Sequence, residues 1–353
     1  MTASDVPSQD FSNDLAQSED GVRLVETDTT FEWWYFDTVM DDGSTCVMSF
    51  LNKEPFCQGG LSPTLLLNIS RPGEPLIAVE QAEPSASYSA ALDHCDVRMG
   101  AQSVSGDLRT YVIHTEVVTT GGVDVVVDLT LNRTVPSYRV GPFKTPEMCA
   151  LQWLGEQVII AAGTVEGTMT IGGVATGVNG SCYHDHQWGG QSVPCAAGGA
   201  PEMRHANGLI PSSWYWGRAQ IDGHAMVFAQ ILTRSEPGGP EAPADVMLLF
   251  SREDGNLFTY ADDLSAVTVT RTQASDLADE FPSLDVAWQD ATGNEVTLHY
   301  EPGELIGEFG RPTKTGKLPY RRYLSDVTMT SRFNGEDVSL GPAKMIWEEN
   351  HFA

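Results

Sequence analysis

The sequence predicts an all-β protein whose antiparallel strands fold into barrels or sandwiches. Short runs rich in β-branched and aromatic residues recur along the chain, and turn residues separate them at regular intervals. Glycine-containing pairs between alternating runs are strong signals for β-hairpins. Four such turns stand out, at 120–122 (Thr-Gly-Gly), 172–173 (Gly-Gly), 222–223 (Asp-Gly) and 334–335 (Asn-Gly).

Helix signals are scarce by comparison. Residues 145–158 begin with Thr-Pro, which is a helix-start pattern, and 275–284 have room for two or three helical turns before Pro282. We therefore expect few and short helices beside the strands.

The length of 353 residues indicates two domains, because single domains commonly hold about 100–200 residues. A stretch rich in Pro and Gly over 194–213 is the best candidate for the connection between them. We predict a flexible N-terminal segment over 1–24, an N-terminal β-barrel domain over 25–205 and a C-terminal β-barrel domain over 206–353.

The balance of acidic and basic residues excludes some classes of binding partner. Asp and Glu number 48 against 20 Lys and Arg, for a net charge of −28, which argues against nucleic acids and anionic membrane surfaces. No stretch reaches the roughly 18–20 apolar residues of a membrane span, and the N-terminus lacks a secretion-signal pattern. We expect a cytoplasmic protein whose six scattered cysteines are reduced and whose partner is a small hydrophobic molecule.

The stretch FEWWYFD at 31–37 places aromatic residues on both faces of one strand. Trp34 and Phe36 share a face with Glu32, whereas Phe31 and Tyr35 point the other way. A carboxylate among aromatic rings is costly unless it is paired or protonated. Glu32 is therefore a candidate catalytic group, and Trp34 and Phe36 are candidate substrate-binding residues.

Two further aromatic segments follow. In SCYHDHQWGG (181–190), strand parity places His184, His186 and Trp188 on one face and Tyr183 with Asp185 on the other. One interpretation is a metal half-site built from His-x-His. The other is a hydrogen-bonded His–Asp network that supports a buried aromatic wall.

The third segment is SWYWGR (213–218). Trp214, Trp216 and Arg218 fall on one face of the predicted strand and Tyr215 on the other. Indole faces suit an apolar guest and stabilise developing positive charge. We take Trp216 as a candidate catalytic residue and the other three as candidate binding residues.

Two isolated polar residues join the candidate site. Asn68 lies inside the apolar run TLLLNIS and needs a hydrogen-bond partner from the protein or a substrate. Lys344 is one of few lysines and lies on a predicted final strand near Trp347. Both are candidate substrate-binding residues, and an exposed strand-end position is the alternative for Lys344.

Common catalytic motifs are missing from the sequence. It contains no Gly-x-Ser-x-Gly elbow, no phosphate-binding loop and no dinucleotide fingerprint, and no third ligand follows His184 and His186 at a metal-binding spacing. We therefore expect neither a metal nor a cofactor. The remaining pattern is an aromatic pocket with a few polar groups, which is typical of a site for an apolar ligand.

The segments FEWWYFD, YHDHQWGG and WYWGRAQIDG, in this order, resemble the AttH/CrtC-like superfamily over roughly residues 25–350. That group contains carotenoid 1,2-hydratases (hydroxyneurosporene synthases) and fungal Diels–Alderases. The resemblance implies two lipocalin-like β-barrel domains and a hydrophobic ligand cavity. It also implies that His186 and Trp188 match catalytic residues of the hydratases.

The resemblance leaves three functions open. The leading hypothesis is a cofactor-independent cyclase of natural-product biosynthesis, of the Diels–Alderase type, acting on a polyene, polyketide or terpenoid. In that case Glu32, Asn68, Trp216 and Lys344 would line the site and the histidine network would be structural. The alternatives are hydration or proton-initiated cyclisation of an isoprenoid alkene, and a hydrophobic-ligand carrier without catalysis. The sequence lacks the Asp that hydratases carry after the histidine segment, which favours cyclisation.

Overall fold

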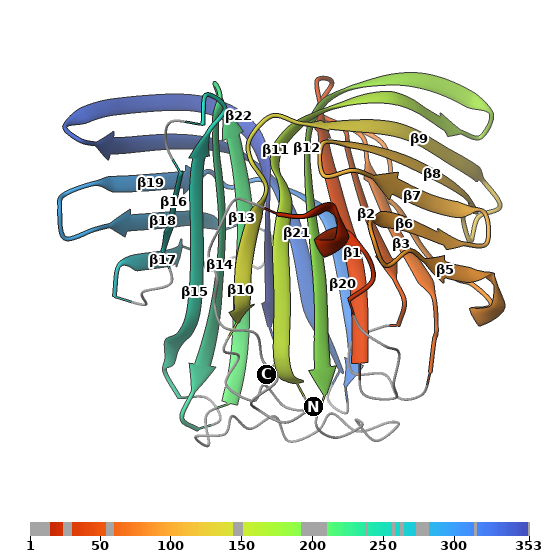
Figure 1. The fold of residues 1–353 in the computed structure, drawn as a ribbon, viewed down its shortest axis with the longest axis horizontal. Coiled ribbons are helices and arrows are strands. Elements are labelled where there is room, and N and C mark those ends of the chain that lie inside the picture. Colours follow the sequence, from red (N-terminus) through yellow and green to blue (C-terminus); the bar gives the residue numbers. More distant parts are fainter. Residues whose placement is uncertain are drawn as a thin grey trace. The chain divides into compact units, whose positions relative to one another are not determined.

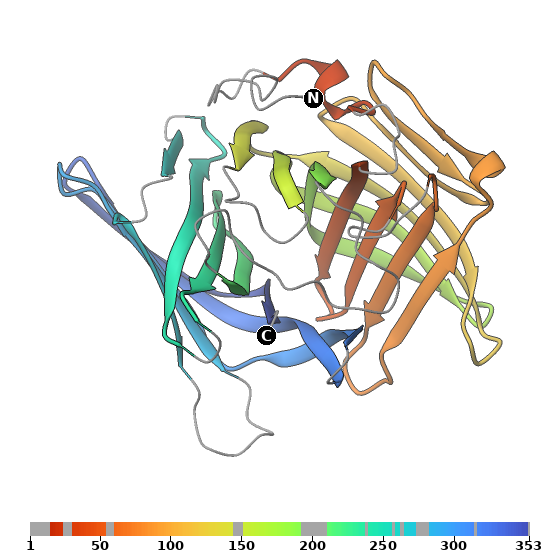
Figure 2. The ribbon, with the colours of Figure 1, turned by 90° about the horizontal axis from the view of Figure 1, so that it is seen from below.

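The computed structural model describes residues 15–23, 30–53, 60–143, 151–191, 210–236, 239–255, 258–261, 265–272, 282–313 and 316–351. The chain divides into two compact units, Met1–Met203 and Arg204–Ala353. Each unit is built on one antiparallel β-sheet (Figure 1), and Figure 2 shows how the sheets curl. The predicted all-β fold class is confirmed.

The first unit holds a twelve-stranded sheet of order β4-β3-β2-β1-β12-β11-β9-β8-β7-β6-β5, with β10 paired to β11. Its elements are η2 (Gln17–Asp20), β1 (Thr30–Met40), β2 (Thr45–Leu51), β3 (Thr64–Ser70), β4 (Ile77–Ala82), η3 (Ser85–Ser87), β5 (Tyr88–Ala90), β6 (Cys95–Met99), β7 (Gln102–Gly106), β8 (Thr110–Val118), β9 (Asp124–Arg133), β10 (Tyr138–Phe143), β11 (Leu151–Ile171) and β12 (Val174–Gln191).

The second unit holds a ten-stranded sheet of order β16-β15-β14-β13-β22-β21-β19-β18-β17, with β20 paired to β21. Its strands are β13 (Ile210–Ile221), β14 (His224–Arg234), β15 (Glu241–Arg252), β16 (Phe258–Ala261), β17 (Val267–Thr272), β18 (Ser283–Gln289), β19 (Glu295–Tyr300), β20 (Glu304–Thr313), β21 (Gly316–Phe333) and β22 (Glu336–His351).

All four hairpin turns predicted from the sequence are confirmed, since each joins consecutive strands of one sheet. Asp222 and Gly223 have φ values of 46° and 75°, and Asn334 and Gly335 have 52° and 83°. Positive φ at both central positions matches the right-handed twist of the flanking strands. These residue types tolerate that conformation, so the local sequence fixes where the strands reverse.

The prediction of a helix over 145–158 is wrong for residues 151–158, which the structure describes. Residues 151–158 belong to β11, whereas 145–150 lie outside the described residues. The β-branched run that follows, from Val158 to Ile160, is fully buried between β12 and the strands on its other side. Tertiary pairing of this long strand therefore overrides the weak helix-start signal. Most of the second expected helix, 275–281, also lies outside the described residues.

Each unit has its own hydrophobic core. In the first unit it includes Trp34 and Phe36 of β1, together with residues of β2 to β4, β6 to β9, β11 and β12. In the second it includes Trp347 of β22 and Tyr300 of β19. We call the face of a sheet that meets this core the inner face, and the opposite face the outer face. Both faces of β1 are largely buried, with nine of its eleven residues in the buried class.

Gly173 provides a test of the hairpin geometry. Its φ is +83° and a Cβ there would touch nothing within 4 Å, so only backbone strain opposes a side chain. Gly173→Ala should lower the free energy of unfolding by about 1 kcal/mol, because alanine disfavours this conformation. Gly177 of the same hairpin has equal space and no positive φ. Urea denaturation should show Gly177→Ala as neutral, and equal losses from both changes would contradict the assignment.

Candidate functional site

The pairing of β1 with β12 brings two of the sequence motifs together on the inner face of the first unit. Trp34 lies opposite His186, Phe36 opposite His184, and Glu32 opposite Trp188. Directly opposed residues of an antiparallel pair point to the same face. The register therefore divides the residues of both segments between the two faces of the sheet as the sequence predicted.

His184 is enclosed on the inner face. Its ring stacks on Phe36 at a centroid distance of 4.0 Å and meets the edge of Tyr111 at 4.6 Å. Nδ1 lies 2.9 Å from the carbonyl oxygen of Tyr35, which can only accept, so Nδ1–H is the donor. Nε2 lies 3.3 Å from Oδ2 of Asp20. The side chain has no exposed surface, so Asp20 and Tyr35 satisfy it internally.

His186 lies between two carboxylates. Its Nε2 is 2.8 Å from Oε1 of Glu32, and its Nδ1 is 3.4 Å from Oδ1 of Asp20. The ring stacks on Trp34 at 4.5 Å. Burial alone lowers the pKa of His186, but hydrogen bonds and charge from Asp20 and Glu32 outweigh it and raise the pKa above the usual 6.5. The arrangement favours an imidazolium held between two anions.

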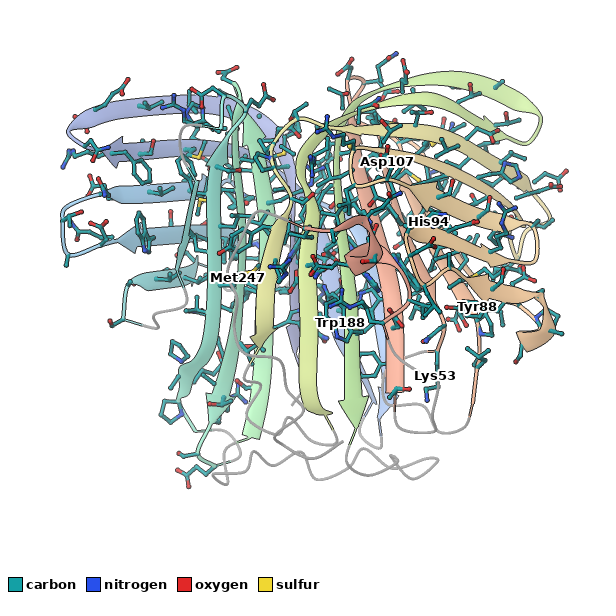
Figure 3. The ribbon with its side chains drawn as sticks, in the orientation of Figure 1. Lys53, Tyr88, His94, Asp107, Trp188 and Met247 are labelled. Carbon is teal, nitrogen blue, oxygen red and sulfur yellow. The ribbon has the colours of Figure 1, made fainter. Side chains whose placement is uncertain are left out.

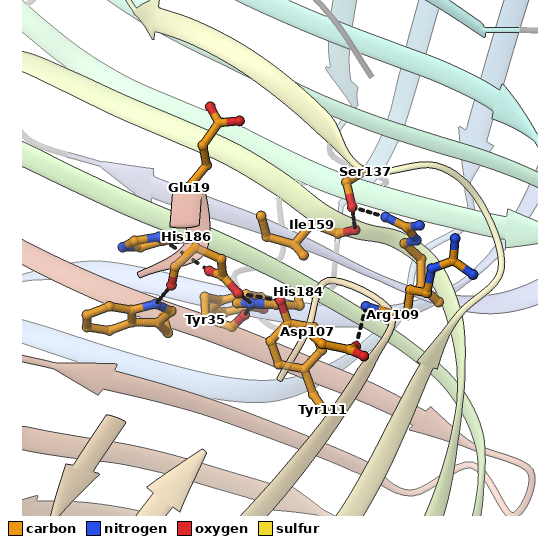
Figure 4. Close-up of polar contacts among 12 residues, drawn as sticks. Glu19, Tyr35, Asp107, Arg109, Tyr111, Ser137, Ile159, His184 and His186 are labelled. Atoms are coloured by element: carbon orange, nitrogen blue, oxygen red, sulfur yellow. Dashed lines mark hydrogen bonds and ion pairs between the residues drawn. The ribbon is translucent and has the colours of Figure 1, made fainter. Parts of the chain in front are cut away.

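Asp20 is the centre of this network, and sequence reasoning missed it. It ends η2 and is fully buried, and it accepts a hydrogen bond from the Tyr111 hydroxyl. Figure 4 shows Tyr111 together with His184 and His186. Burial raises its pKa, but His184 and His186 lower it further, so the net shift is strongly downward. Asp20 has no sequence signal, because it lies in an acidic polar stretch without an apolar pattern.

The segment around η2 is fixed to the first unit by several polar contacts. Arg139 forms a bidentate ion pair with Glu19 at 2.7 and 2.6 Å, and the backbone N–H of Arg23 donates to Glu32 at 2.7 Å. The backbone carbonyl of Asp20 accepts from the indole of Trp34 at 3.1 Å. Residues 15–23 of the predicted flexible segment are thus held in place, and 1–14 and 24 lie outside the described residues.

Trp188 is half-buried on the same face, near the end of β12 (Figure 3). The guanidinium of Arg23 lies 4.5 Å above its ring, which is a cation–π arrangement. Its ring also meets that of His186 at a centroid distance of 5.2 Å, and it leaves no room for a Cβ at Gly155. These contacts fix the indole, and its partial exposure distinguishes it from the fully covered Trp34.

The outer face of the first unit carries a second polar group. Tyr35, Tyr183 and Asp185 lie there with 6%, 0% and 1% of their surface exposed, and the two tyrosine rings meet edge to face at 6.0 Å. Asp185 therefore points away from the histidines. The expected network of His184, Asp185 and His186 is therefore wrong about Asp185. The carboxylates that pair with the two histidines are Asp20 and Glu32.

Two more side chains belong to this outer face. Asn68 lies opposite Val47, which lies opposite Asp37. Its Nδ2 donates to the carbonyl of Leu67 at 2.9 Å, and its buried Oδ1 has no hydrogen-bond partner among the described residues. Glu156 of β11 is 3% exposed, and burial raises the pKa of its carboxyl to about 8. Sequence reasoning missed Glu156 because its segment was assigned to a helix.

The outer face of the second unit is aromatic. Trp214, Trp216 and Arg218 share it as predicted, whereas Tyr215 lies in the core. Trp216 is opposite Glu348, and the ring of Trp214 meets Tyr320 edge to face at 6.1 Å. Buried residues of the neighbouring strands that lie outside the core cluster extend this face: Val227, Met247, Leu249, Arg322 and Ile346.

The inner face of the second unit holds its own buried carboxylate. Glu349 accepts from the Tyr323 hydroxyl at 2.7 Å and pairs with Arg271 at 2.7 Å. Lys344 is not part of this group, because it pairs with Asp326 at 3.1 Å and both side chains are about half exposed. The structure thus unites Glu32 with His186 in one unit and places Trp216 with Glu348 in the other.

Among the residues that the structure describes, no group of three or more His, Cys, Asp or Glu has a geometry that holds a metal ion. No described helix is long and apolar enough to cross a membrane.

The buried network predicts a large effect of Asp20→Asn. Removing this charge leaves an imidazolium with one carboxylate fewer, and breaking a buried ion network costs about 3–5 kcal/mol of unfolding free energy. Glu19→Gln is the matched control, because the partly exposed Glu19–Arg139 pair contributes about 1 kcal/mol or less. Urea denaturation monitored by tryptophan fluorescence measures both, and equal losses would contradict the central role of Asp20.

The raised pKa of His186 predicts a stability profile with pH. A pKa that is higher in the folded state adds stability that is complete below about pH 6.5 and is lost as pH rises through the folded value. The stability advantage of wild type over His186→Gln should therefore shrink from about pH 5.5 to about pH 9. Thermal unfolding across this range is the measurement. An advantage that widens as pH rises would refute the assignment.

Comparisons with known proteins place the fold. No protein-family model matches the sequence, and no curated protein matches it significantly. Solved structures do. A candidate AttH from Nitrosomonas europaea shares 16% identity over 94% of each chain, with a TM-score of 0.62. CghA, solved with Sch210972, shares 14% identity over 96% of each chain, with a TM-score of 0.56.

A third similar structure is kievitone hydratase from Nectria haematococca. It shares 10% identity over 91% of this chain and 88% of its own, with a TM-score of 0.52. At these identities the likeness concerns the fold. The resemblance that the three aromatic segments indicated is confirmed at that level: the chain has the lipocalin-like architecture of candidate AttH, CghA and kievitone hydratase.

Proposed function

We propose that this protein is a cofactor-independent enzyme of natural-product biosynthesis that folds a hydrophobic polyene, polyketide or terpenoid and directs its intramolecular cyclisation. The reaction is of the Diels–Alderase type, in which the product is an isomer of the substrate. The observation that carries the proposal is the outer face of the second unit, where Trp214 and Trp216 lie on the face that does not form the core.

The outer face of the second unit suits a ligand because its buried apolar residues do not pack in the hydrophobic core. Trp216 is 8% exposed, and Met247 and Leu249 beside it are fully buried, although none of the three belongs to the core cluster. Sheets that are solvated on one face normally carry polar residues there. An apolar and aromatic outer face therefore suits a ligand that is itself apolar.

An intramolecular cyclisation depends on the conformation in which the substrate is held and needs no nucleophile. Holding a flexible chain in a reactive fold supplies about 7–11 kcal/mol of the barrier in favourable intramolecular cases. Indole faces add stabilisation of positive charge that develops in the transition state. Two polar residues on this face, Arg322 and Glu348, form an ion pair with one another, which suits an orienting role.

The similar structures support a hydrophobic small-molecule substrate. CghA has been solved with Sch210972, and kievitone hydratase is named for its action on kievitone. The sequence resemblance to fungal Diels–Alderases points the same way. The inner-face histidines fit a structural role, because His184 and His186 are fully enclosed by protein groups.

The experiment compares Trp216→Ala with Trp288→Ala. Both indoles lie in the second unit with 8% and 6% exposure, but Trp288 belongs to the core and stacks on Phe333. Extracts of a source strain lacking the gene are incubated with each purified protein and analysed by mass spectrometry. Wild type should convert an accumulated precursor into an isomer of unchanged mass. Trp216→Ala should lower this rate about 10²-fold or more, because misplacement of the reacting groups has costs of that order.

The matched control separates binding from stability. Trp288→Ala should unfold at lower temperature but retain the turnover rate of its folded fraction. A product heavier by one water molecule would instead identify a hydratase. Ligand that co-purifies and returns unaltered would identify a carrier, and either outcome would overturn the cyclase proposal.

A further inference from the structure

Residues 15–23, which we call the plug, carry Asp20 into the first unit without being part of its sheet. The plug contains the short turn η2 and no strand residue. Asp20 and Gly21 are its buried residues, and the partly buried Leu15 and Val22 pack against the hydrophobic core. The plug is therefore attached mainly through one buried carboxylate and two apolar side chains, rather than through a ladder of strand hydrogen bonds.

The groups that hold the carboxylate of Asp20 belong to the strands. His184 and His186 lie on β12 and Tyr111 lies on β8, and all three side chains are fully buried. The sheet itself orients both imidazole rings: Nδ1 of His184 donates to a backbone carbonyl of β1 at 2.9 Å, and Nε2 of His186 lies 2.8 Å from Glu32. These contacts do not involve the plug, so the strands position the site by themselves.

Asp20 fills this site incompletely. Its Oδ2 accepts from the Tyr111 hydroxyl and lies 3.3 Å from Nε2 of His184. Its Oδ1 lies 3.4 Å from Nδ1 of His186, and both atoms are buried without a hydrogen-bond partner among the described residues. Good hydrogen bonds of this kind span about 2.7–3.2 Å. A carboxylate that is not tethered to the plug can therefore approach His186 more closely than Asp20 does.

We propose that the site filled by Asp20 is a carboxylate-binding site of the first unit, which an external organic acid occupies when the plug detaches. The plug indicates the chemistry of that ligand, because it presents one carboxylate beside the apolar Leu15 and Val22. The ligand class is thus a short organic acid with a small apolar body. Binding exchanges one carboxylate for another, so no covalent bond or proton changes place.

This site is separate from the surface to which the proposed function is assigned. It lies on the inner face of the first unit, whereas Trp214 and Trp216 lie on the outer face of the second unit. Loss of the carboxylate site would therefore leave the proposed function intact, and the reverse also holds.

Gly21 offers a way to displace the plug without changing the site. A Cβ at Gly21 would lie 2.5 Å from the carbonyl oxygen of Leu92, and the N–H of Val22 next to it donates to the carbonyl of Ala91 at 2.8 Å. Such a contact forces a shift, because the obstructing atom belongs to the backbone. Gly21→Ala should therefore loosen the plug while Tyr111 and both histidines keep their places.

Hydrogen exchange of the unmodified protein tests whether the plug detaches separately. The amides of Val22 and Arg23, which donate to Ala91 and Glu32, should exchange by local opening about tenfold or more faster than those of β1. Butyrate should accelerate exchange at these two amides, because it competes with the plug, and the uncharged butanol should not. Exchange of the plug at the rate of β1, with or without butyrate, would overturn the proposal.

Calorimetric titration with butyrate tests the site directly. Gly21→Ala should bind butyrate about tenfold or more tightly than wild type, since the open state becomes more populated. Gly177→Ala, where a Cβ meets nothing within 4 Å, should bind like wild type. Adding Tyr111→Phe to Gly21→Ala should weaken butyrate about tenfold, because a hydrogen bond to a charged group is lost. Failure of folded Gly21→Ala to bind butyrate would contradict the site.

A second pair of variants tests the fit of a carboxylate. Asp20→Ala leaves the space of the carboxylate empty, whereas Asp20→Asn fills it with a neutral amide of the same shape. Acetate, compared with chloride at equal ionic strength, should raise the unfolding temperature of Asp20→Ala by about 2–4 °C and leave Asp20→Asn unchanged. Equal shifts in both variants, or none in folded Asp20→Ala, would overturn the proposal.

Discussion

The antiparallel register between β1 and β12 is the constraint on which the first unit depends. Because Trp34 lies opposite His186 and Phe36 opposite His184, both histidines point into the core, and Asp185 points away from it. Side chains alternate along a strand, so a slip of one residue would exchange the two faces completely. Such a slip would move buried charges away from their partners and aromatic rings out of the core.

The inner-face charges make that register specific. Asp20 and Glu32 enclose His186, and the Tyr111 hydroxyl completes the shell of Asp20. A buried network of paired charges stabilises one arrangement and penalises others in which a charge loses its partner. The second unit also has a buried carboxylate with polar partners: Glu349 accepts hydrogen bonds from the Tyr323 hydroxyl and from Arg271.

The sequence was sufficient for the all-β fold class and the four hairpin turns, because these depend on local patterns. The Asp-Gly and Asn-Gly turns and the division of 31–37 into two faces follow from alternation and backbone preference alone. The contact between His186 and Asp20 could not be predicted in the same way, because more than 160 residues separate the two in the sequence. Glu156 was hidden for another reason: a helix-start pattern before β11 concealed its parity, and only the long pairing with β12 reveals it.

The two faces of the first unit hold carboxyls with opposite tendencies. Asp20, beside two histidines, has a strongly lowered pKa and stays charged, whereas burial raises the pKa of Glu156 to about 8. Both carboxyls keep one buried oxygen without a hydrogen-bond partner among the described residues, Oδ1 of Asp20 and Oε1 of Glu156. The opposite pKa shifts therefore follow from the charged neighbours: His184 and His186 lower the pKa of Asp20, whereas burial is what shifts the pKa of Glu156.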